Sequence, residues 1–327
     1  MMKKMKWLAF TLFILLAFAG LAGCNTTEEQ PKEDTAVEQQ NENQANETEQ
    51  EAVNFPVTIT DATGAEVVIE EEPERIISII PSATEIAFSL GIGDKIVGVS
   101  DWDNYPEEVN EIEKVGGLDV STEKIVSLEP DLVLANSSNG NSIEALRNID
   151  VTVLVVDANS LDETFESIRM IAKATGTKNN AEEIIAKMEG DRDEIINVVK
   201  EIPEEERKKV WVEVSQDLYT AGKGTFMNEL IELAGGTNIM SDQEGWPQVS
   251  EETVIEKNPD VIFITYGYYI ENAAEQVKDR ENWKSVNAIK EEQVFELDSD
   301  MVNRPGPRIT QGLKQIAAYL YPDKFAE

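Results

Sequence analysis

One stretch of this sequence occurs twice, at a fixed offset along the chain. Residues 120–134 (VSTEKIVSLEPDLVL) align with residues 249–263 (VSEETVIEKNPDVIF), and each copy reads as a helix that follows a serine, a Pro-Asp turn and a buried strand. Gly116 and Gly245 precede the two copies at the same distance. The repeat predicts two pseudo-copies of one α/β unit, although unrelated helix–strand units also share this hydrophobic pattern.

The first α/β domain is predicted over residues 54–160. It opens with alternating apolar residues around a turn at residues 61–64, which indicates a hairpin. Short apolar strands then alternate with amphipathic helices, and this order favours a small parallel sheet. The predicted strands are 75–80, 95–99, 132–135 and 151–156, and the predicted helices are 82–90, 121–128 and 142–148.

Residues 161–203 predict two linking helices, a short one and a long one, with an interruption near Gly176. The α/β pattern resumes over residues 204–327 and predicts a second domain. Its predicted strands are 210–214, 261–265 and 293–297, and its predicted helices are 226–234, 251–257 and 308–319. A chain of 327 residues is long enough for two domains of about 100–150 residues each.

The N-terminus predicts a secretory signal over residues 1–24, because lysines precede an apolar run at residues 7–22 and the sequence LAGC at residues 21–24. The run is too short to favour a permanent membrane span. Cys24 is the only cysteine and matches the lipobox at which bacterial lipoproteins are acylated, so we predict a lipid anchor; a secreted protein with a chance cysteine is the alternative. Residues 25–53 are polar and acidic and predict a disordered tether.

Composition excludes several classes of function. With 28 Lys plus Arg against 64 Asp plus Glu, the formal net charge of −36 repels nucleic acid and anionic lipid head groups. The chain has no histidine and its lone cysteine is already assigned, so Ser-His-Asp and Cys-His catalysis and His-rich metal sites are absent. It also lacks the phosphate-binding Gly-x-x-x-x-Gly-Lys-Ser/Thr loop. We therefore predict a protein that is not an enzyme, with no catalytic residues, no metal site and no resident cofactor.

Glu123 and Glu252 occupy equivalent positions in the two copies of the repeat, near the start of a helix that follows a serine. A helix-capping carboxylate would also sit here, and this is the structural alternative. The functional interpretation is that two equivalent domains each present one carboxylate on the same face. Such a pair would suit basic residues of a two-subunit partner with matching symmetry.

Several segments resemble one known family. Residues 75–91 (RIISIIPSATEIAFSLG), residues 97–99 (VGV), residues 105–106 (YP) and both Pro-Asp units are similar to the iron-siderophore and cobalamin substrate-binding proteins of ABC importers. The resemblance covers residues 75–319. It implies two Rossmann-like α/β lobes with central parallel-type sheets, joined by a single long α-helix, with the ligand held in the cleft between them. The predicted helix at about 178–200 lies where this joining helix is expected.

The resemblance also implies partners. One glutamate per lobe docks with arginines of the permease in this family, and these positions match Glu123 and Glu252. The expected partners are an ABC permease dimer with its ATPase subunits and a small chelate or corrinoid that contains iron or cobalt. The chain itself is expected to be a monomer at the outer face of the cell membrane, anchored through Cys24, with no nucleic-acid partner.

Within the family, the sequence is most similar to the cobalamin-binding members around residues 219–223, 245–250 and 304–308. The similarity implies that Trp246 and Arg304 face the cleft. Trp102 lies just after a predicted strand and is a third candidate, and three tyrosines after residue 265 follow a strand at the end where α/β folds bind ligands, or are simply loop aromatics. The predicted ligand-binding residues are Trp102, Trp246, Tyr219, Tyr266 and Arg304.

Chemistry supports these choices, because aromatic rings bury a broad, partly apolar disc and an arginine meets its amide or carboxylate edges. Arg304 would serve an anionic chelate equally well, and Trp246 beside a proline could instead be a core aromatic. Two cleft-lining aromatic positions of the cobalamin binders correspond to Gly117 and Asn136 here, so part of the aromatic wall is missing.

The predicted function is therefore capture of cobalamin or another corrinoid, or of a ferric siderophore, by an extracytoplasmic lipoprotein that delivers it to an ABC importer. A haem receptor of the same fold is one alternative; the lack of histidine makes it the less favoured ligand. A carboxylate-based cell-surface hydrolase and a sensor subunit that signals through a partner are the others.

Overall fold

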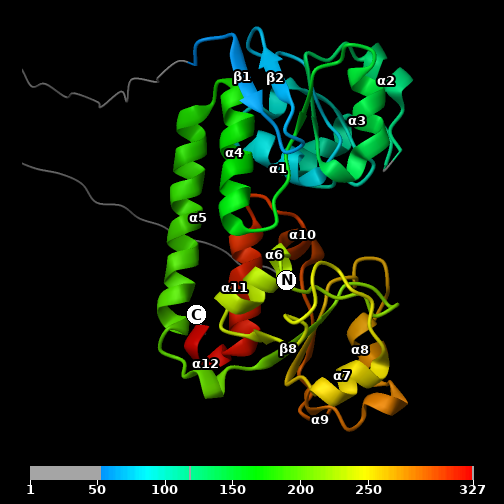
Figure 1. Cartoon of the computed structure of the whole chain (residues 1–327), viewed down its shortest axis with the longest axis vertical. Coiled ribbons are helices and arrows are strands. Elements are labelled where there is room, and N and C mark those ends of the chain that lie inside the picture. The colour runs from blue at the N-terminus through cyan, green and yellow to red at the C-terminus, as the bar shows by residue number, and fades with distance from the viewer. Residues whose placement is uncertain (1–52, 118, 326–327) are drawn as a thin grey trace, which may run out of the picture. The chain divides into compact units, whose positions relative to one another are not determined.

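The computed structural model describes residues 53–117 and 119–325 (Figure 1). Two parallel sheets form two lobes, one with five strands in the order β5-β4-β3-β6-β7 and one with four in the order β11-β10-β8-β9. This confirms the predicted α/β class with two lobes. The predicted signal peptide, Cys24 and the tether up to residue 52 lie outside the described residues.

The N-terminal lobe begins with the antiparallel hairpin of β1 (Val57–Thr60) and β2 (Glu66–Ile69), in which alternate residues are buried. Crossover segments that contain helices join most of the parallel strands that follow, as parallel pairing requires. The strands are β3 (Ile76–Ser78), β4 (Ile96–Val99), β5 (Glu113–Lys114), β6 (Leu132–Ala135) and β7 (Val153–Val155), and the helices are α1 (Pro81–Ser89), α2 (Thr122–Ser127) and α3 (Gly140–Arg147).

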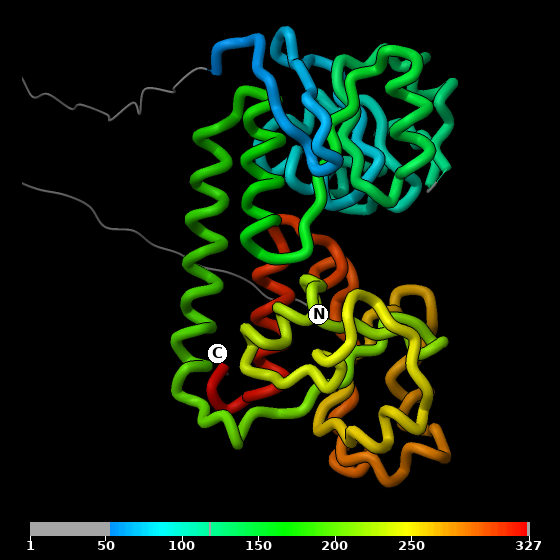
Figure 2. Tube along the Cα trace, in the orientation of Figure 1, coloured from blue at the N-terminus to red at the C-terminus, as the bar shows by residue number. Residues whose placement is uncertain are grey.

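Two long helices lead from the first lobe to the second. α4 (Leu161–Thr175) ends at Gly176, whose positive φ of 75° lets the chain turn, and α5 (Lys178–Val199) follows at once. α5 packs against α4 and against α11 (Ile309–Leu320) of the second lobe, and Figure 2 shows the chain following this path. The two lobes are thus joined by helix packing as well as by chain connection.

The C-terminal lobe repeats the α/β order. Its strands are β8 (Lys209–Glu213), β9 (Thr237–Asn238), β10 (Val261–Ile264) and β11 (Val294–Glu296). Besides α11, its helices are α6 (Phe226–Leu233), α7 (Glu251–Lys257), α8 (Ala273–Lys278), α9 (Asn287–Lys290), α10 (Ser299–Asn303) and α12 (Pro322–Phe325). Short 3-10 helices lie at Gly93–Lys95, Glu107–Glu111, Ser137–Asn139, Glu204–Glu206 and Glu281–Trp283.

The repeated segment folds in the same way in both lobes, as α2 followed by β6 and as α7 followed by β10. The aspartate of the Pro-Asp turn exchanges equivalent hydrogen bonds in each copy. Oδ2 of Asp131 accepts from the backbone N–H of Arg75 at 2.9 Å, and Oδ2 of Asp260 accepts from that of Lys209 at 3.0 Å. Each aspartate also donates its backbone N–H to the carbonyl of the same partner at 2.8 Å. The turn therefore aligns the strand with its neighbour.

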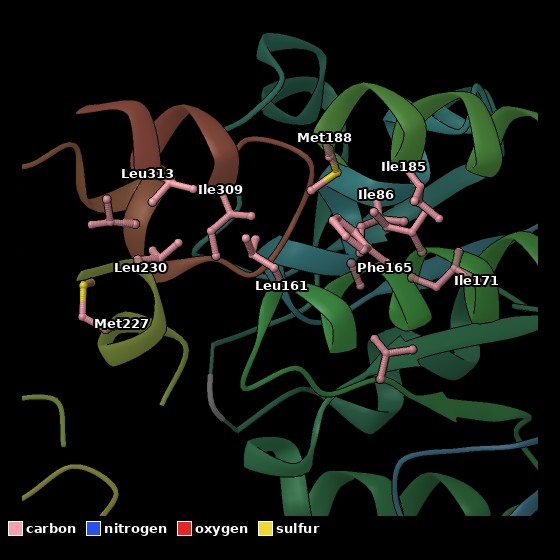
Figure 3. Close-up of a cluster of buried hydrophobic side chains, with 14 of the residues drawn as sticks. Ile86, Leu161, Phe165, Ile171, Ile185, Met188, Met227, Leu230, Ile309 and Leu313 are labelled. Atoms are coloured by element: carbon pink, nitrogen blue, oxygen red, sulfur yellow. The ribbon is translucent and has the colours of Figure 1, made fainter. Parts of the chain in front are cut away.

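A single cluster of buried apolar side chains extends through both lobes (Figure 3). Ile86 of α1 and Phe165 of α4 belong to it on one side, and Leu230 of α6 and Leu313 of α11 on the other. Met188 of α5 lies between these groups in Figure 3. Because the apolar contacts are continuous, burial of this surface stabilises the arrangement of the lobes as well as each lobe by itself.

Candidate ligand-binding cleft

Two adjoining cavities lie between the lobes, with volumes of about 460 and about 750 Å³. Both are lined by Ile80, Pro81, Asn303 and Arg304, so each lobe contributes to each cavity. The remaining walls come largely from segments that follow β4, β6, β7, β10 and β11. The cavities therefore lie at the carboxyl edges of both sheets, where α/β proteins bind ligands. We call the two cavities together the cleft.

The walls of the cleft combine amide side chains with aromatic rings. An amide donates and accepts hydrogen bonds, so it can pair with another amide in either direction. Trp102 and Tyr268 are 59% and 72% exposed, which leaves both rings free to cover a flat ligand. The amides are those of Asn104, Asn136, Asn159 and Asn303.

Trp102 lies over the backbone of Gly117. A Cβ atom at Gly117 would stand 3.1 Å from Nε1 of Trp102, so the indole would have to shift by a few tenths of an ångström to admit even a methyl group. The backbone N–H of Trp102 donates to Oγ of Ser100 at 3.3 Å. The ring of Trp102 thus occupies space that an aromatic residue at position 117 would need.

Trp246 and Tyr219 lie outside the lining of the two cavities. Trp246 packs edge-on against Phe226, with ring centroids 5.6 Å apart, and Phe226 lines the smaller cavity. Trp246 is 43% exposed, which differs from the alternative of a core aromatic. Tyr219 is exposed, and its backbone forms a bridge with Gln248. Contact of either ring with a ligand remains a prediction.

The prediction that Tyr266 lines the cleft is wrong. Its side chain is 1% exposed and its hydroxyl donates to Oε1 of Glu213, itself fully buried, at 2.6 Å. Burial and the neighbouring Glu213 carboxylate raise the pKa of Tyr266. Glu213 also binds Arg280 through both of its oxygens, at 2.6 and 2.7 Å. Tyr266 therefore belongs to a buried polar network inside the lobe, and Tyr268 is the tyrosine that lines the cleft.

Arg304 lines both cavities, but its guanidinium group is engaged within the protein. Nη1 donates to Oε1 of Glu85 at 3.0 Å, and Nη2 lies 2.8 Å from Oδ1 of Asp300. Glu85 is 2% exposed and also accepts from Nη2 of Arg308 at 2.7 Å. Sequence reasoning missed Glu85. The signal was a carboxylate within the otherwise apolar and small residues of α1, because a buried acid needs a cation.

Glu123 and Glu252 have the same place in α2 and α7. Ser121 and Ser250 are the N-caps, since the hydroxyl of each accepts from the backbone N–H of the third helical residue. Each glutamate is the second helical residue, whereas a capping box uses the third. Both side chains are exposed, and within the described residues no ion pair engages either carboxylate. A hydrogen bond with Ser250 lowers the pKa of Glu252.

No helix in residues 53–117 and 119–325 combines the length and the apolar character that a membrane crossing needs. In the same residues, no three side chains of the types that ligate metal ions converge on one point.

The family model described as periplasmic binding protein matches residues 76–301. The chain belongs to this family. The predicted resemblance is therefore confirmed, and the periplasmic binding proteins are binding proteins rather than enzymes. Residues 76–301 begin at β3 and end in α10, so the match includes both sheets and most of the cleft.

Three members illustrate the similarity. The ABC transporter substrate-binding lipoprotein YvrC of Bacillus subtilis is 41% identical over 96% of this chain and 97% of its own length. A cobalamin-binding protein of Halobacterium salinarum is 31% identical over 81% of this chain and 74% of its own. The solved structure of a possible iron-binding protein from Staphylococcus epidermidis superposes with a TM-score of 0.69 at 37% identity, over 77% of this chain and all of the other.

Proposed function

We propose that this chain captures a corrinoid, such as cobalamin, in the cleft and hands it to the permease of an ABC importer. The observation that carries the proposal is the lining, in which four asparagine amides accompany the exposed rings of Trp102 and Tyr268. A corrinoid is a broad ring with primary amides along its rim, so amides on the walls can pair with it while aromatic rings cover its apolar face. The halobacterial relative that is named for cobalamin supports the same ligand.

A ferric siderophore is the second candidate. The staphylococcal structure, at 37% identity, is named as a possible iron-binding protein, and this similarity favours an iron chelate. A hydroxamate chelate also presents amide-like groups to the asparagines of the cleft. The corrinoid is preferred because the exposed indole of Trp102 suits a large flat ring.

Delivery requires an anchor and a docking surface. We propose that the signal sequence is cleaved immediately before Cys24, that Cys24 carries the lipid, and that residues 25–53 tether the folded chain at the outer face of the membrane. YvrC, which aligns over 96% of the chain, is named a lipoprotein and supports this anchor. Glu123 and Glu252 are proposed to bind arginines of the permease dimer, since exposed carboxylates at equivalent places in two lobes suit a partner with two-fold symmetry.

Ligand titration tests the proposal. The soluble chain that lacks residues 1–24 is titrated with cyanocobalamin, ferric siderophores and haem by tryptophan fluorescence, and every signal is checked by calorimetry. We expect saturable one-to-one binding of cyanocobalamin, and about tenfold weaker binding by Trp102→Ala because the ring that covers the ligand is gone. Val68→Ala, which removes an exposed apolar side chain outside the cleft, is the matched control. Binding of a ferric siderophore alone would assign the chain to iron uptake.

A further inference from the structure

Arg304 is the one positive charge among the described residues that line the cleft, and it is already neutralised. Its guanidinium binds Glu85 at 3.0 Å and Asp300 at 2.8 Å, and donates to Oδ1 of Asn104 at 2.8 Å. Glu85 in turn binds Arg308 at 2.7 Å. Two carboxylates therefore balance two guanidinium groups in this cluster. Arg304 has no surplus charge to offer an anionic ligand.

Four further carboxylates line the cleft without a cation. Within the described part of the chain, none of them forms an ion pair, and the hydrogen bonds that three of them accept come from uncharged groups. Two belong to the N-terminal lobe and two to the C-terminal lobe, so negative charge faces the ligand from both sides. They are Asp101, Asp157, Glu296 and Asp298.

We propose that the cleft selects its cargo by charge. It accepts an uncharged or cationic ligand whose rim carries primary amides, and it rejects the same ligand once a rim amide has become a carboxylate. This inference rests on the proposed function, because it requires the cleft to be the ligand site. It also separates the two candidate ligands, since an uncharged corrinoid meets no repulsion whereas an anionic ferric chelate does.

Two physical effects weaken the binding of a ligand that carries a carboxylate. A carboxylate on the ligand would lie close to carboxylates of both lobes, and in partly solvated surroundings such repulsion weakens binding by about tenfold to about a hundredfold. Inside the cleft the ligand carboxylate would also lose water without gaining a cation. An amide in the same place can donate to a carboxylate or pair with an asparagine. The formal net charge of −36 adds a repulsion at longer range that salt screens.

Calorimetry with two probes tests the proposal on the unmodified protein. The probes are cyanocobalamin and its monocarboxylic acid, in which one peripheral amide has been hydrolysed. We expect the acid to bind at least about tenfold more weakly at about 20 mM salt, and the ratio to shrink at about 500 mM as the charges are screened. Equal affinities, or tighter binding of the acid, would overturn charge selection and leave corrinoid capture intact.

If the chain does not bind corrinoids, the proposed function fails, and charge selection is then tested with iron chelates. If neither corrinoid binds, the same titration is made with a cationic ferric trihydroxamate and an anionic ferric tricatecholate. Tighter binding of the cationic chelate supports charge selection for an iron cargo, whereas equal or tighter binding of the anionic chelate overturns it. Absence of binding across all four probes would reject the cleft as a site for either class and charge selection with it.

A pair of variants tests whether the four carboxylates of the cleft, rather than the total charge of the protein, cause the discrimination between the two corrinoids. The cleft variant replaces the four carboxylates with their amides, and the control removes the same charge from the exposed surface of α5 and of the turn just beyond it. We expect the cleft variant to bind the two corrinoids with nearly equal affinity and the control to discriminate like the wild type. Loss of discrimination in the control would show an effect of total charge and overturn the proposal. The cleft variant is Asp101→Asn, Asp157→Asn, Glu296→Gln and Asp298→Asn, and the control is Glu183→Gln, Glu189→Gln, Glu194→Gln and Glu201→Gln.

A milder variant covers the case in which the cleft variant does not fold. Asp101→Asn changes an exposed side chain that has no hydrogen-bond or ion-pair partner among the described residues. We expect it to reduce the discrimination by a factor of about two to five, since one of four charges is removed. Discrimination as strong as that of the wild type in this variant would show that the carboxylates of the cleft do not cause it, and would overturn the proposal.

Discussion

Asp103 follows Trp102, and its two carboxylate oxygens differ in their surroundings. Oδ2 accepts from the backbone N–H of Ser100 at 2.9 Å and from its hydroxyl, while Oδ1 is buried and accepts no hydrogen bond from the residues that the structure describes. The residue is 4% exposed. Burial raises the pKa of Asp103 above its ordinary value of 3.8, against the opposing effects of Ser100, Thr84 and Lys114. The folded protein therefore holds this proton to a higher pH than the unfolded chain does.

The replacement Asp103→Asn should reveal this titration. Between the unfolded pKa near 3.8 and the raised folded pKa, the folded state binds more protons, so the contribution of Asp103 to stability is present at low pH and is lost as the pH rises. We expect the unfolding free energy of the wild type, relative to the Asn variant, to fall by about 1.4 kcal/mol for each unit of pKa shift. Urea denaturation from about pH 4 to about pH 7 measures the difference.

Asp94→Asn is the control for this series, because it removes an exposed carboxylate from the same lobe. If the difference for Asp103→Asn did not change with pH, the Asp103 carboxyl group would titrate alike in both states. The effect of burial on its pKa would then be smaller than its environment indicates.

The paired helices α2 and α7 present the two glutamates that are proposed to dock with the permease. The double variant Glu123→Ala and Glu252→Ala should keep the affinity for ligand within about twofold, since neither side chain lines the cleft. It should weaken binding to the permease complex by tenfold or more if each glutamate forms a charge-assisted contact with an arginine. Co-purification with the permease in detergent measures docking. Uptake of radiolabelled ligand by cells measures delivery.

Glu144→Ala with Glu256→Ala is the matched control. It removes one exposed glutamate from each lobe, on α3 and α7, and leaves both helix N-termini intact. Equal loss of docking in the control would indicate a general effect of charge. Loss of ligand affinity in the double variant would contradict the separation of docking surface and cleft.

The elements were largely predictable from the sequence, because hydrophobic periodicity and turn residues are local signals. The strand expected at residues 132–135 is β6, and the helix expected near 178–200 is α5. The repeat also predicted equivalent units, and the matching bonds of Asp131 and Asp260 give its physical reason. Periodicity failed for Tyr266, because a residue just past β10 can face a loop or the core with the same pattern.

The polar contacts of the cleft could not be derived in this way. Glu85 and Arg304 are 219 positions apart, and only the packed lobes bring them to 3.0 Å. From the sequence alone, Arg304 would be taken for a free cation that could bind an anionic ligand. The charge preference of the cleft therefore depends on tertiary structure, although every carboxylate that creates it is visible in the sequence.

At the scale of the whole molecule, Glu85 and the continuous apolar core both hold the lobes together. Glu85 lies in α1 of the first lobe, and its partners Arg304 and Arg308 lie at the end of α10 and the start of α11 in the second. The bond to Glu85 raises the pKa of Arg308. Because the core also crosses between the lobes, neither lobe can unfold without exposing apolar surface of the other.

We therefore expect the wild type to unfold in one cooperative transition, and Glu85→Gln to lower the unfolding free energy by about 2–3 kcal/mol while the transition stays single. The loss follows because two largely buried guanidinium groups lose a shared carboxylate: Arg308 would keep no ion-pair partner among the described residues, and Arg304 would keep only Asp300. Glu182→Gln, which breaks an exposed pair with Arg169, should cost less than about 1 kcal/mol. Scanning calorimetry measures all three proteins. Two separate transitions in Glu85→Gln would show that the ion cluster, rather than the shared apolar core, couples the lobes.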